Sequence, residues 1–464
     1  MSRRATGPRP RLSSCWIALL MMPGFAWSQT FAPMTKPVKK SGVVSTTVER
    51  DDIVSLQLRF GVMDLKPDDF LVITAEDDNN ASQRMDVDDL VVWDRLTAWF
   101  NGNSVKVDLH WFNHEVAPQI AIANVYTSEI YAQFLDLEKS RYTDKDACSL
   151  TDRRIPTRDD RMGRLMPVGC TGFIMSNGTY LTAGHCNYPV VGSQTGNWMQ
   201  IMQLNVPFSY PNGQPRHPPP EYQFPVLQAS INTQSGPPVP GHDWLVYDCG
   251  PNSNTGLTPI QAGNFFRGRQ IGELSSDARI NITGFGSDNQ PPGSSGAFNA
   301  RSQSLQVATG FFLTQLATSA LNNQIRYIVD TEGGNSGSPV IVNGTDHTIA
   351  IHTDGLCQTQ GFNVGTSFNL AALATAINQQ PIRNQPTRTI AYLDGGTLAG
   401  ADSDGTYFKP FANLTGWWIN SVVHATLVVT PGDYGYETLN GSLSFSPGLQ
   451  VIVPKGRVSF WPRR

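Results

Sequence analysis

Three short motifs of this sequence bring together the side chains that acyl transfer needs. Ser336 lies in the glycine-rich segment GGNSGSPV, His185 lies near the end of the apolar segment LTAGHC, and Asp243 precedes the apolar run WLV. A serine hydroxyl is a weak nucleophile until a neighbouring base takes its proton, and a carboxylate can hold that base in one orientation. We therefore expect His185 to act as general base on Ser336, oriented by Asp243.

The glycines beside the serine leave room for backbone N–H groups to point at a carbonyl under attack. We expect the N–H groups of Gly334 and Ser336 to form this oxyanion hole. Asp248 is the alternative to Asp243 as the acid. In a strand of period two that starts at Asp243, however, Asp248 points to the opposite face.

The elements that must position these residues are expected to be strands. The chain has 464 residues with 42 Gly, 32 Pro and only 16% charged residues, which is typical of a loop-rich β protein. Alternating apolar residues predict strands near 54–60 and 105–109. Short apolar runs at 70–73 and 90–93 are typical of buried strands, and 369–379 has helical spacing.

In this order, TAGHC, DWLV and GGNSGSPV resemble the chymotrypsin/trypsin-fold serine peptidases. The resemblance covers about residues 148–380. It implies an all-β fold with two antiparallel, trypsin-like β-barrels, and a serine endopeptidase with the triad His185, Asp243 and Ser336. The sequence lacks HExxH, zinc-knuckle and phosphate-loop motifs, so we expect neither a cofactor nor a metal.

The resemblance also implies a specificity pocket with Asp330 at its floor, where a buried carboxylate would select Lys or Arg. The segment DTEGGNSGSP is most similar to bacterial glutamyl endopeptidases, which keep that aspartate and yet cut after acids. In those enzymes the positions of Thr331 and His352, here followed by Thr353, would bind the substrate carboxylate. Asp354 would disfavour an acidic substrate. We expect cleavage after Glu or Asp, with cleavage after Lys or Arg as the alternative.

Five of the six cysteines lie beyond the N-terminal apolar segment. By the same resemblance, Cys170 pairs with Cys186 and Cys148 pairs with Cys357, which leaves Cys249 as a buried thiol. The pair Cys148–Cys249 is the alternative. Disulfides are the expected state of these residues in an exported protein.

A basic N-terminus, a short apolar run and small residues near Ser28 predict a secretory signal peptide, and hence a secreted or periplasmic protein. The C-terminal segment resembles the opening rung of a right-handed parallel β-helix. The predicted domains are a signal peptide (1–28), an N-terminal β-sandwich-like domain (29–140), a trypsin-like peptidase domain (141–380) and a short C-terminal β-rich segment (381–464).

A net charge of −4 gives no reason to expect nucleic acid or an anionic membrane as partner. No later segment is apolar enough to span a membrane. Acidic clusters at 76–78 and 86–89 could hold calcium, but without EF-hand spacing a solvated loop is preferred. The expected partners are protein or peptide substrates, and the oligomeric state stays open.

One departure from trypsin concerns activation. Trypsin has an aspartate at the position of Asn335, and that aspartate receives the new N-terminus after cleavage. Asn335 is uncharged, so we expect no such switch at Arg154-Ile155. Activation would be removal of the N-terminal domain, or no step at all. Two other functions stay open: a catalytically silent binding protein of this fold, and an esterase that uses the same triad.

Overall fold

The computed structural model describes residues 40–129, 147–149, 151–187, 199–234, 239–272, 274–288, 299–319, 322–385, 388–395, 403–412, 425–430, 432–436, 449–456 and 458–462. They belong to one compact unit, Lys40–Arg464. The predicted signal peptide lies outside the described residues. No helix in these ranges has the length and apolar character needed to cross a lipid bilayer.

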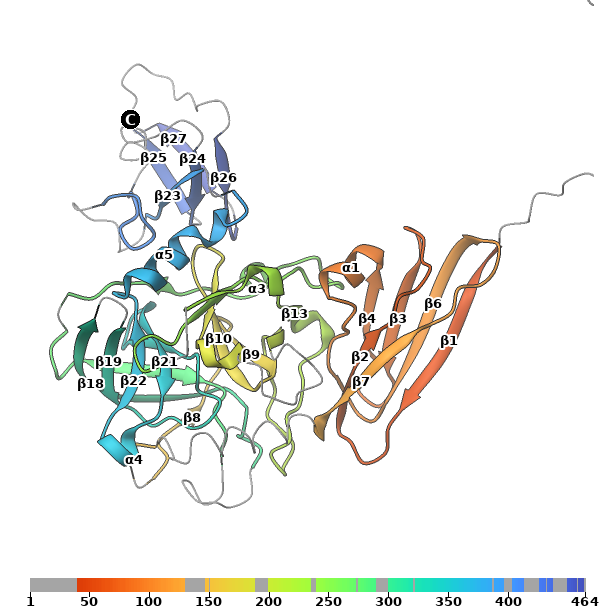
Figure 1. Ribbon diagram of the computed structural model, residues 1–464, viewed down its shortest axis with the longest axis horizontal. Coiled ribbons are helices and arrows are strands. Elements are labelled where there is room, and N and C mark those ends of the chain that lie inside the picture. Colours follow the sequence, from red (N-terminus) through yellow and green to blue (C-terminus); the bar gives the residue numbers. More distant parts are fainter. Residues whose placement is uncertain are drawn as a thin grey trace, which may run out of the picture. The chain divides into compact units, whose positions relative to one another are not determined.

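The N-terminal part contains two antiparallel sheets, of order β1-β6-β3-β4 and β5-β2-β7 (Figure 1). Every second residue of β6 from Val105 to Trp111 is buried, which is the period expected of a strand with one face on a core. The strands are β1 (Lys40–Glu49), β2 (Ser55–Phe60), β3 (Phe70–Ala75), β4 (Ala81–Asp86), β5 (Phe100–Asn101), β6 (Ser104–His114) and β7 (Ile122–Thr127). The predicted N-terminal β structure is confirmed.

The expectation of a buried strand at 90–93 is wrong, because these residues lie in or directly after helix α1 (Val87–Val92). Asp86 caps this helix by accepting a hydrogen bond from the backbone N–H of Asp89. The Asp89 carboxylate accepts one from the N–H of Asp86 in return. This reciprocal pair is a capping box. The acidic cluster at 86–89 therefore starts a helix.

The first sheet of the central region has the order β13-β12-β9-β10-β11-β15-β14. An isolated antiparallel bridge between Val226 and Cys249 links β13 to the strand end that follows β15. The strands are β9 (Met162–Pro167), β10 (Cys170–Ile174), β11 (Tyr180–Thr182), β12 (Met199–Gln203), β13 (Gln223–Pro225), β14 (Asn232–Thr233) and β15 (Leu245–Tyr247).

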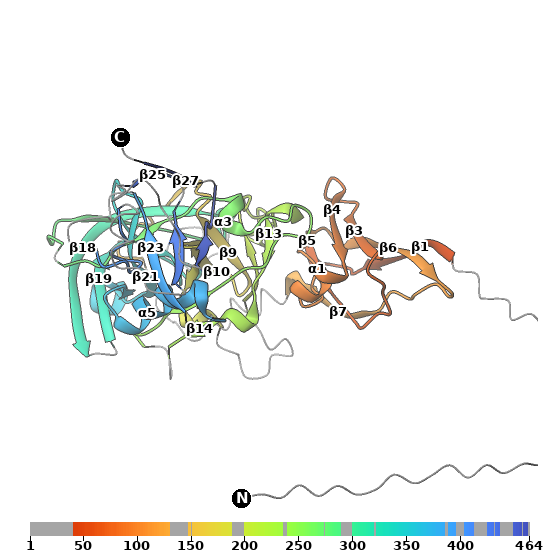
Figure 2. The same cartoon turned by 90° about the horizontal axis from the view of Figure 1, so that it is seen from above.

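The second central sheet closes on itself. Its order is β21-β20-β17-β18-β19-β22, and β22 pairs again with β21, which completes a six-stranded ring. Two short strands outside the ring also pair with it: β8 with β18, and β16 with β21. Figure 2 shows β18 and β19 as a long antiparallel pair. The strands are β8 (Ile155–Pro156), β16 (Arg267–Gly268), β17 (Arg279–Gly284), β18 (Gln306–Ser319), β19 (Asn322–Ile328), β20 (Pro339–Val342), β21 (His347–Asp354) and β22 (Asn363–Ser367).

The C-terminal segment pairs its strands in parallel, as the resemblance to a β-helix predicts. β23 pairs with β24 and β24 with β26, while β25 pairs with β27. The bounds are β23 (Thr389–Leu393), β24 (Ala425–Val429), β25 (Gly432–Tyr436), β26 (Gln450–Ile452) and β27 (Val458–Pro462). Tyr392, Tyr407 and Val428 belong to the same apolar core as the first central sheet.

Short helices connect the strands. The helix predicted at 369–379 is α5 (Ala371–Gln379), which buries Leu373, Ala376 and Ile377. The others are α3 (Pro259–Ala262), α4 (Cys357–Gln360) and the 3₁₀ turns η1 (Gly184–Asn187), η2 (Pro220–Tyr222), η3 (Gln228–Ser230) and η4 (Gln380–Ile382). The predicted all-β class, with two central β-barrel-type sheets flanked by further β structure, is confirmed. The domain boundaries at 140 and 380 stay predictions.

Candidate active site

The pairing of β11 with β15 brings His185 to Asp243. The two strands are antiparallel, with Thr182 opposite Leu245. His185 follows the first strand in the turn η1 and Asp243 precedes the second, so both lie at the same end of the pair. The backbone N–H of His185 donates to Asp243 Oδ1 at 2.9 Å, and its Nδ1 lies 2.5 Å from Oδ2. This two-point contact fixes the ring and directs Nε2 away from the acid.

Asp243 is itself held from the second sheet. Its backbone N–H donates to Oγ1 of Thr366 at 3.1 Å, and that hydroxyl donates to the Asp243 carbonyl at 2.8 Å. The carboxylate is 2% exposed. The alternative acid, Asp248, forms an ion pair with Arg383 instead.

The turn that carries Ser336 packs directly on the histidine segment. Thr171 donates from its N–H to the Ser336 carbonyl at 2.9 Å and from Oγ1 to the Gly334 carbonyl at 2.8 Å. Gly337 has a φ of +88°, and a Cβ there would collide with the Thr171 carbonyl and with Oγ1 of Thr182. Glycine at this position therefore lets the serine turn approach the strand end that leads to His185.

The serine turn carries the two backbone N–H groups that were expected to form the oxyanion hole. The N–H of Asn335 donates to the Glu332 carbonyl at 2.9 Å, and Gly334 between them has a φ of +98°. Among the described residues, the N–H groups of Gly334 and Ser336 donate to no acceptor. The N–H group of Asn335 is thus used within the turn, while the N–H groups of its two neighbours keep the donor capacity that an oxyanion hole would need.

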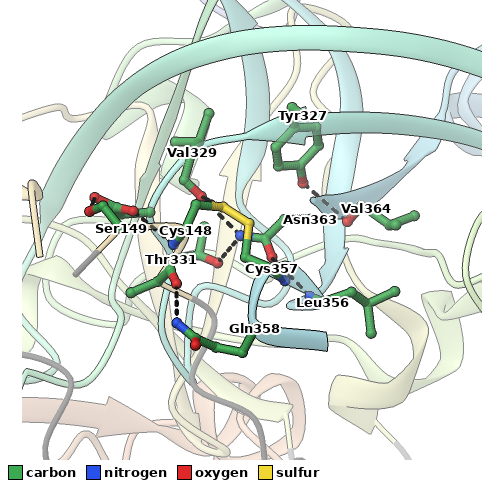
Figure 3. The surroundings of a disulfide bond; sticks show 12 residues. Cys148, Ser149, Tyr327, Val329, Thr331, Leu356, Cys357, Gln358, Asn363 and Val364 are labelled. Carbon is green, nitrogen blue, oxygen red and sulfur yellow. Dashed lines mark hydrogen bonds between the residues drawn. A yellow bond between two sulfur atoms is a disulfide. The ribbon is translucent and has the colours of Figure 1, made fainter. Parts of the chain in front are cut away.

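Both disulfides implied by the resemblance are present. Cys170 pairs with Cys186 at a Cα–Cα distance of 6.2 Å, and Cys148 with Cys357 at 4.8 Å (Figure 3). Cys249 is a buried free thiol, and burial raises its pKa well above the ordinary value. The alternative pair Cys148–Cys249 is not formed.

The disulfide next to the histidine also bears on metal binding. One ligand atom each of Cys170, Cys186 and His185 lie within 4.8 Å of one another, which is close enough for a metal site. Both sulfur atoms are used in the disulfide, so they supply no thiolate.

Asp330 lies beneath a segment that we call the strap, residues 147–149 and 151–154. Its carboxylate accepts hydrogen bonds from the N–H of Cys148 at 2.8 Å, Oγ of Ser149 at 2.9 Å and the N–H of Arg153 at 3.1 Å. The residue is 5% exposed. One of these hydrogen bonds is to Oδ1 of Asp330 and two are to Oδ2. The carboxylate therefore anchors the strap.

The other two residues expected in the specificity pocket, His352 and Thr331 (the latter labelled in Figure 3), are buried and held by neighbours that the sequence did not indicate. Asn363 donates from Nδ2 to Oγ1 of Thr331 at 3.0 Å. The Tyr327 hydroxyl lies 2.6 Å from Nδ1 of His352. Burial, and to a lesser extent the charge of His185, lowers the pKa of His352 to about 3. The ring is therefore neutral at pH 7, with a single N–H.

Thr353 and Asp354 end the strand that carries His352. Oγ1 of Thr353 donates to the Asp354 carboxylate at 2.7 Å. Burial raises the pKa of Asp354, and the negative charge of Asp243 raises it further.

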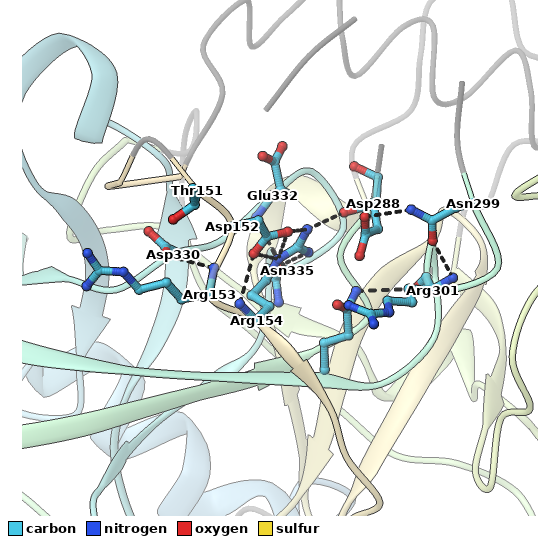
Figure 4. A network of polar contacts seen from close by, with 12 residues as sticks. Thr151, Asp152, Arg153, Arg154, Asp288, Asn299, Arg301, Asp330, Glu332 and Asn335 are labelled. Atoms are coloured by element: carbon cyan, nitrogen blue, oxygen red, sulfur yellow. Dashed lines mark hydrogen bonds and ion pairs between the residues drawn. The ribbon is translucent and has the colours of Figure 1, made fainter. Parts of the chain in front are cut away.

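Arg154, which was considered from the sequence only as a cleavage position, has a buried side chain beneath the serine turn (Figure 4). Its guanidinium makes hydrogen bonds to both oxygens of Asp152 and to Oδ1 of Asn335. Burial alone would raise the pKa of Asp152, but the hydrogen bonds and charge of Arg154 outweigh it and lower that pKa. The Asp-x-Arg spacing, which recurs at Asp159 and Arg161, is the signal that could have revealed this pair.

No protein-family model matches this sequence, and no curated protein matches it either. Among solved structures, a Glu endopeptidase in complex with MPD is 18% identical, with 50% of this chain and 98% of that chain covered and a TM-score of 0.38. A thermostable serine protease from an extremophilic microorganism is 13% identical (50% and 99%, TM-score 0.35), and a scabies mite inactivated protease paralogue is 14% identical (50% and 99%, TM-score 0.34).

Proposed function

We propose that the protein is an exported serine endopeptidase with the triad His185, Asp243 and Ser336. The observation that supports this most is the two-point contact between His185 and Asp243 beside the serine turn. The buried acid keeps the proton of the imidazole on Nδ1, so Nε2 is the basic nitrogen.

In this mechanism Oγ of Ser336 attacks the scissile carbonyl while Nε2 of His185 takes its proton. The N–H groups of Gly334 and Ser336 stabilise the oxyanion. His185 then gives the proton to the leaving amine, and water hydrolyses the acyl-enzyme by the same steps. Asp243 stabilises the imidazolium that forms in each half of the reaction.

We further propose that the enzyme cleaves after Glu or Asp, and that Thr331, His352 and Thr353 line the pocket. Because Asp330 already accepts three hydrogen bonds from the strap, it is poorly suited to bind a substrate cation. His352 is neutral at pH 7, and its Nδ1 lies against the Tyr327 hydroxyl, so Nε2 is the nitrogen that we expect to face the substrate. A substrate carboxylate would accept a hydrogen bond from this ring and favour its protonation.

The test is a map of the bonds that the full-length exported protein cuts in denatured proteins, beside Ser336→Ala as control. We expect cuts after Glu and Asp that the variant does not make. Serine-dependent cuts after Lys or Arg would assign the specificity to Asp330. If the wild type makes no serine-dependent cuts and Ser336 fails to react with a fluorophosphonate, the protein is a silent binding protein of this fold. Turnover of esters but not of peptides would identify an esterase.

A further inference from the structure

Arg154 connects the strap to the turn that forms the oxyanion hole. Its NH1 group donates to Oδ1 of Asn335 at 3.4 Å, and its NH2 group donates to the Ser287 carbonyl at 2.6 Å. Oδ1 of Asn335 also accepts the N–H of Glu332 at 3.0 Å, which closes the serine turn. The N–H of Ser287 donates to the Gly333 carbonyl at 2.8 Å. One guanidinium therefore binds both segments that shape this turn; Figure 4 labels Arg154 and Asn335 of this network.

The guanidinium is held rigidly where it makes these contacts. Nε donates to Oδ1 of Asp152 at 3.0 Å and NH2 to Oδ2 at 2.6 Å, and the two side chains are 1% and 6% exposed. Such a bidentate pair fixes the plane of an arginine. A Cβ at Gly286 would collide with NH1 of Arg154 and with Oδ1 of Asn335, so the chain leaves space for this contact.

The bond that follows Arg154 lies in continuous chain. Ile155 is 62% exposed and pairs with Val307, in the short strand β8 beside β18. Asp330 and the disulfide of Cys148 hold the other end of the strap. The guanidinium thus reaches the serine turn with the 154–155 peptide bond intact.

We propose that Arg154 is a positioning residue that orders the oxyanion hole in the uncut chain, so that the enzyme needs no cleavage after Arg154 to become active. This inference rests on the proposed peptidase function. Arg154 touches neither the substrate nor the reacting atoms. It acts through Asn335, whose neighbours Gly334 and Ser336 supply the two N–H donors.

The experiment compares full-length wild type with Arg154→Met, Arg154→Lys and Arg161→Met on one peptide substrate. Arg161 is the matched control, because it makes the same contacts to Asp159 (2.8 and 2.6 Å) away from the serine turn. We expect kcat of Arg154→Met to fall about 100-fold with little change in KM, which is the loss seen when one oxyanion donor is removed. Arg154→Lys should recover part of kcat, and Arg161→Met should match the wild type.

Asp152→Asn is a second variant, similar in shape to the wild type, that loosens Arg154 without removing its side chain, and circular dichroism verifies the fold of both variants. We expect kcat of Asp152→Asn to fall about tenfold. Mass spectrometry of the active wild type should find the 154–155 bond intact. Equal kcat in folded Arg154→Met and wild type would overturn the inference, as would activity that starts only after that bond is cut. A folded wild type without any activity would instead overturn the proposed function.

Discussion

The hydroxyl of Tyr327 lies 2.6 Å from Nδ1 of His352 and 3.1 Å from the carbonyl of Val364. The Tyr327 hydroxyl donates to the Val364 carbonyl and at the same time contacts the His352 ring, so it links the ring to the backbone of β22. The side chain proposed to bind the substrate is therefore oriented by a residue of β19, which is separated from β21 by β22.

We expect Tyr327→Phe to weaken recognition of an acidic residue by the peptidase. Loss of one buried hydrogen bond, of about 1 kcal/mol, should raise KM for a Glu substrate about fivefold and leave kcat nearly unchanged. Steady-state kinetics on Glu and Gln substrates will measure this. Tyr392→Phe, which removes a hydrogen bond to the Asn378 carbonyl elsewhere, is the control. A change in kcat alone would contradict the assignment.

Two buried histidines should make the fold sensitive to acid. Burial is the main cause that lowers the pKa of His352 to about 3 and the pKa of His217 well below its ordinary value, where Arg164 adds to it. In the unfolded chain both titrate near about 6.5, so below that pH the unfolded state binds protons that the folded state does not.

The free energy of unfolding should therefore fall as the pH drops from about 6.5 towards 3, by up to about 1.4 kcal/mol per pH unit for each histidine. Urea unfolding at a series of pH values will give this slope. His352→Leu should reduce the slope of the unfolding free energy against pH by the contribution of one titrating group. An unchanged slope in that variant would mean that His352 is charged in the folded state.

The close approach of the serine turn makes Gly337 sensitive to any side chain. Gly337→Ala should lower activity more than tenfold, because the new methyl group collides with the Thr171 carbonyl and with Thr182. Gly344 is the matched control: its φ is +78°, and a Cβ there meets nothing within 4 Å. Gly344→Ala should cost about 1 kcal/mol of stability and no activity. Equal effects at both positions would show that backbone strain alone matters.

The N-terminal sheets share a core with the first central sheet, and we expect the chain to need them to fold. Met166 and Ile201 pack in the N-terminal core. Gln223 accepts the N–H of Trp99 at 2.9 Å and donates to its carbonyl at 2.7 Å. A chain that begins at residue 141 would expose these groups and should be insoluble or unfolded.

Soluble yield and circular dichroism of that truncated chain will test this, with Gln223→Ala in the full chain as a milder variant. The latter leaves two buried backbone groups of Trp99 unsatisfied and should cost about 1–3 kcal/mol. A truncated chain that folds and cleaves would identify the N-terminal region as removable.

Breaking the disulfide of the strap should affect both stability and catalysis. Replacing Cys148 and Cys357 with serine should cost about 2–5 kcal/mol. It should also lower kcat, because the released strap holds Arg154 less firmly. Thermal unfolding and kinetics of the double variant will show this, beside Cys249→Ala, which leaves both disulfides intact. If the double variant loses stability but keeps the full kcat, the strap does not influence catalysis through the serine turn.

Much of this architecture is predictable from local patterns. Apolar runs next to TAGHC and DW mark the ends of β11 and β15, and the acid lies two residues before its strand, so its contact with His185 follows once the strands pair. α5 likewise follows from apolar spacing, whereas the parallel C-terminal strands were expected only from the resemblance of that segment to a β-helix. In these cases the signal lies within one element.

Local sequence patterns do not predict the contacts between segments that lie far apart in the chain. Asp330 meets the strap about 180 residues earlier in the chain, and Arg154 meets Asn335 at a similar separation. Nothing in either segment indicates its partner. The strand prediction for residues 90–93 was wrong for another reason. Four consecutive apolar residues do not distinguish a strand from a buried helix. The capping pattern of Asp86 and Asp89 would have decided it.

The bond between Cys148 and Cys357 spans 209 residues of chain, and His185, Asp243 and Ser336 all lie inside this covalent ring. A single cut anywhere within the ring opens it but releases no fragment. Self-digestion in an exposed loop would therefore leave the three residues in one molecule of unchanged mass, apart from one added water. Such a nicked enzyme would migrate as one species on a non-reducing gel and separate into pieces only after reduction.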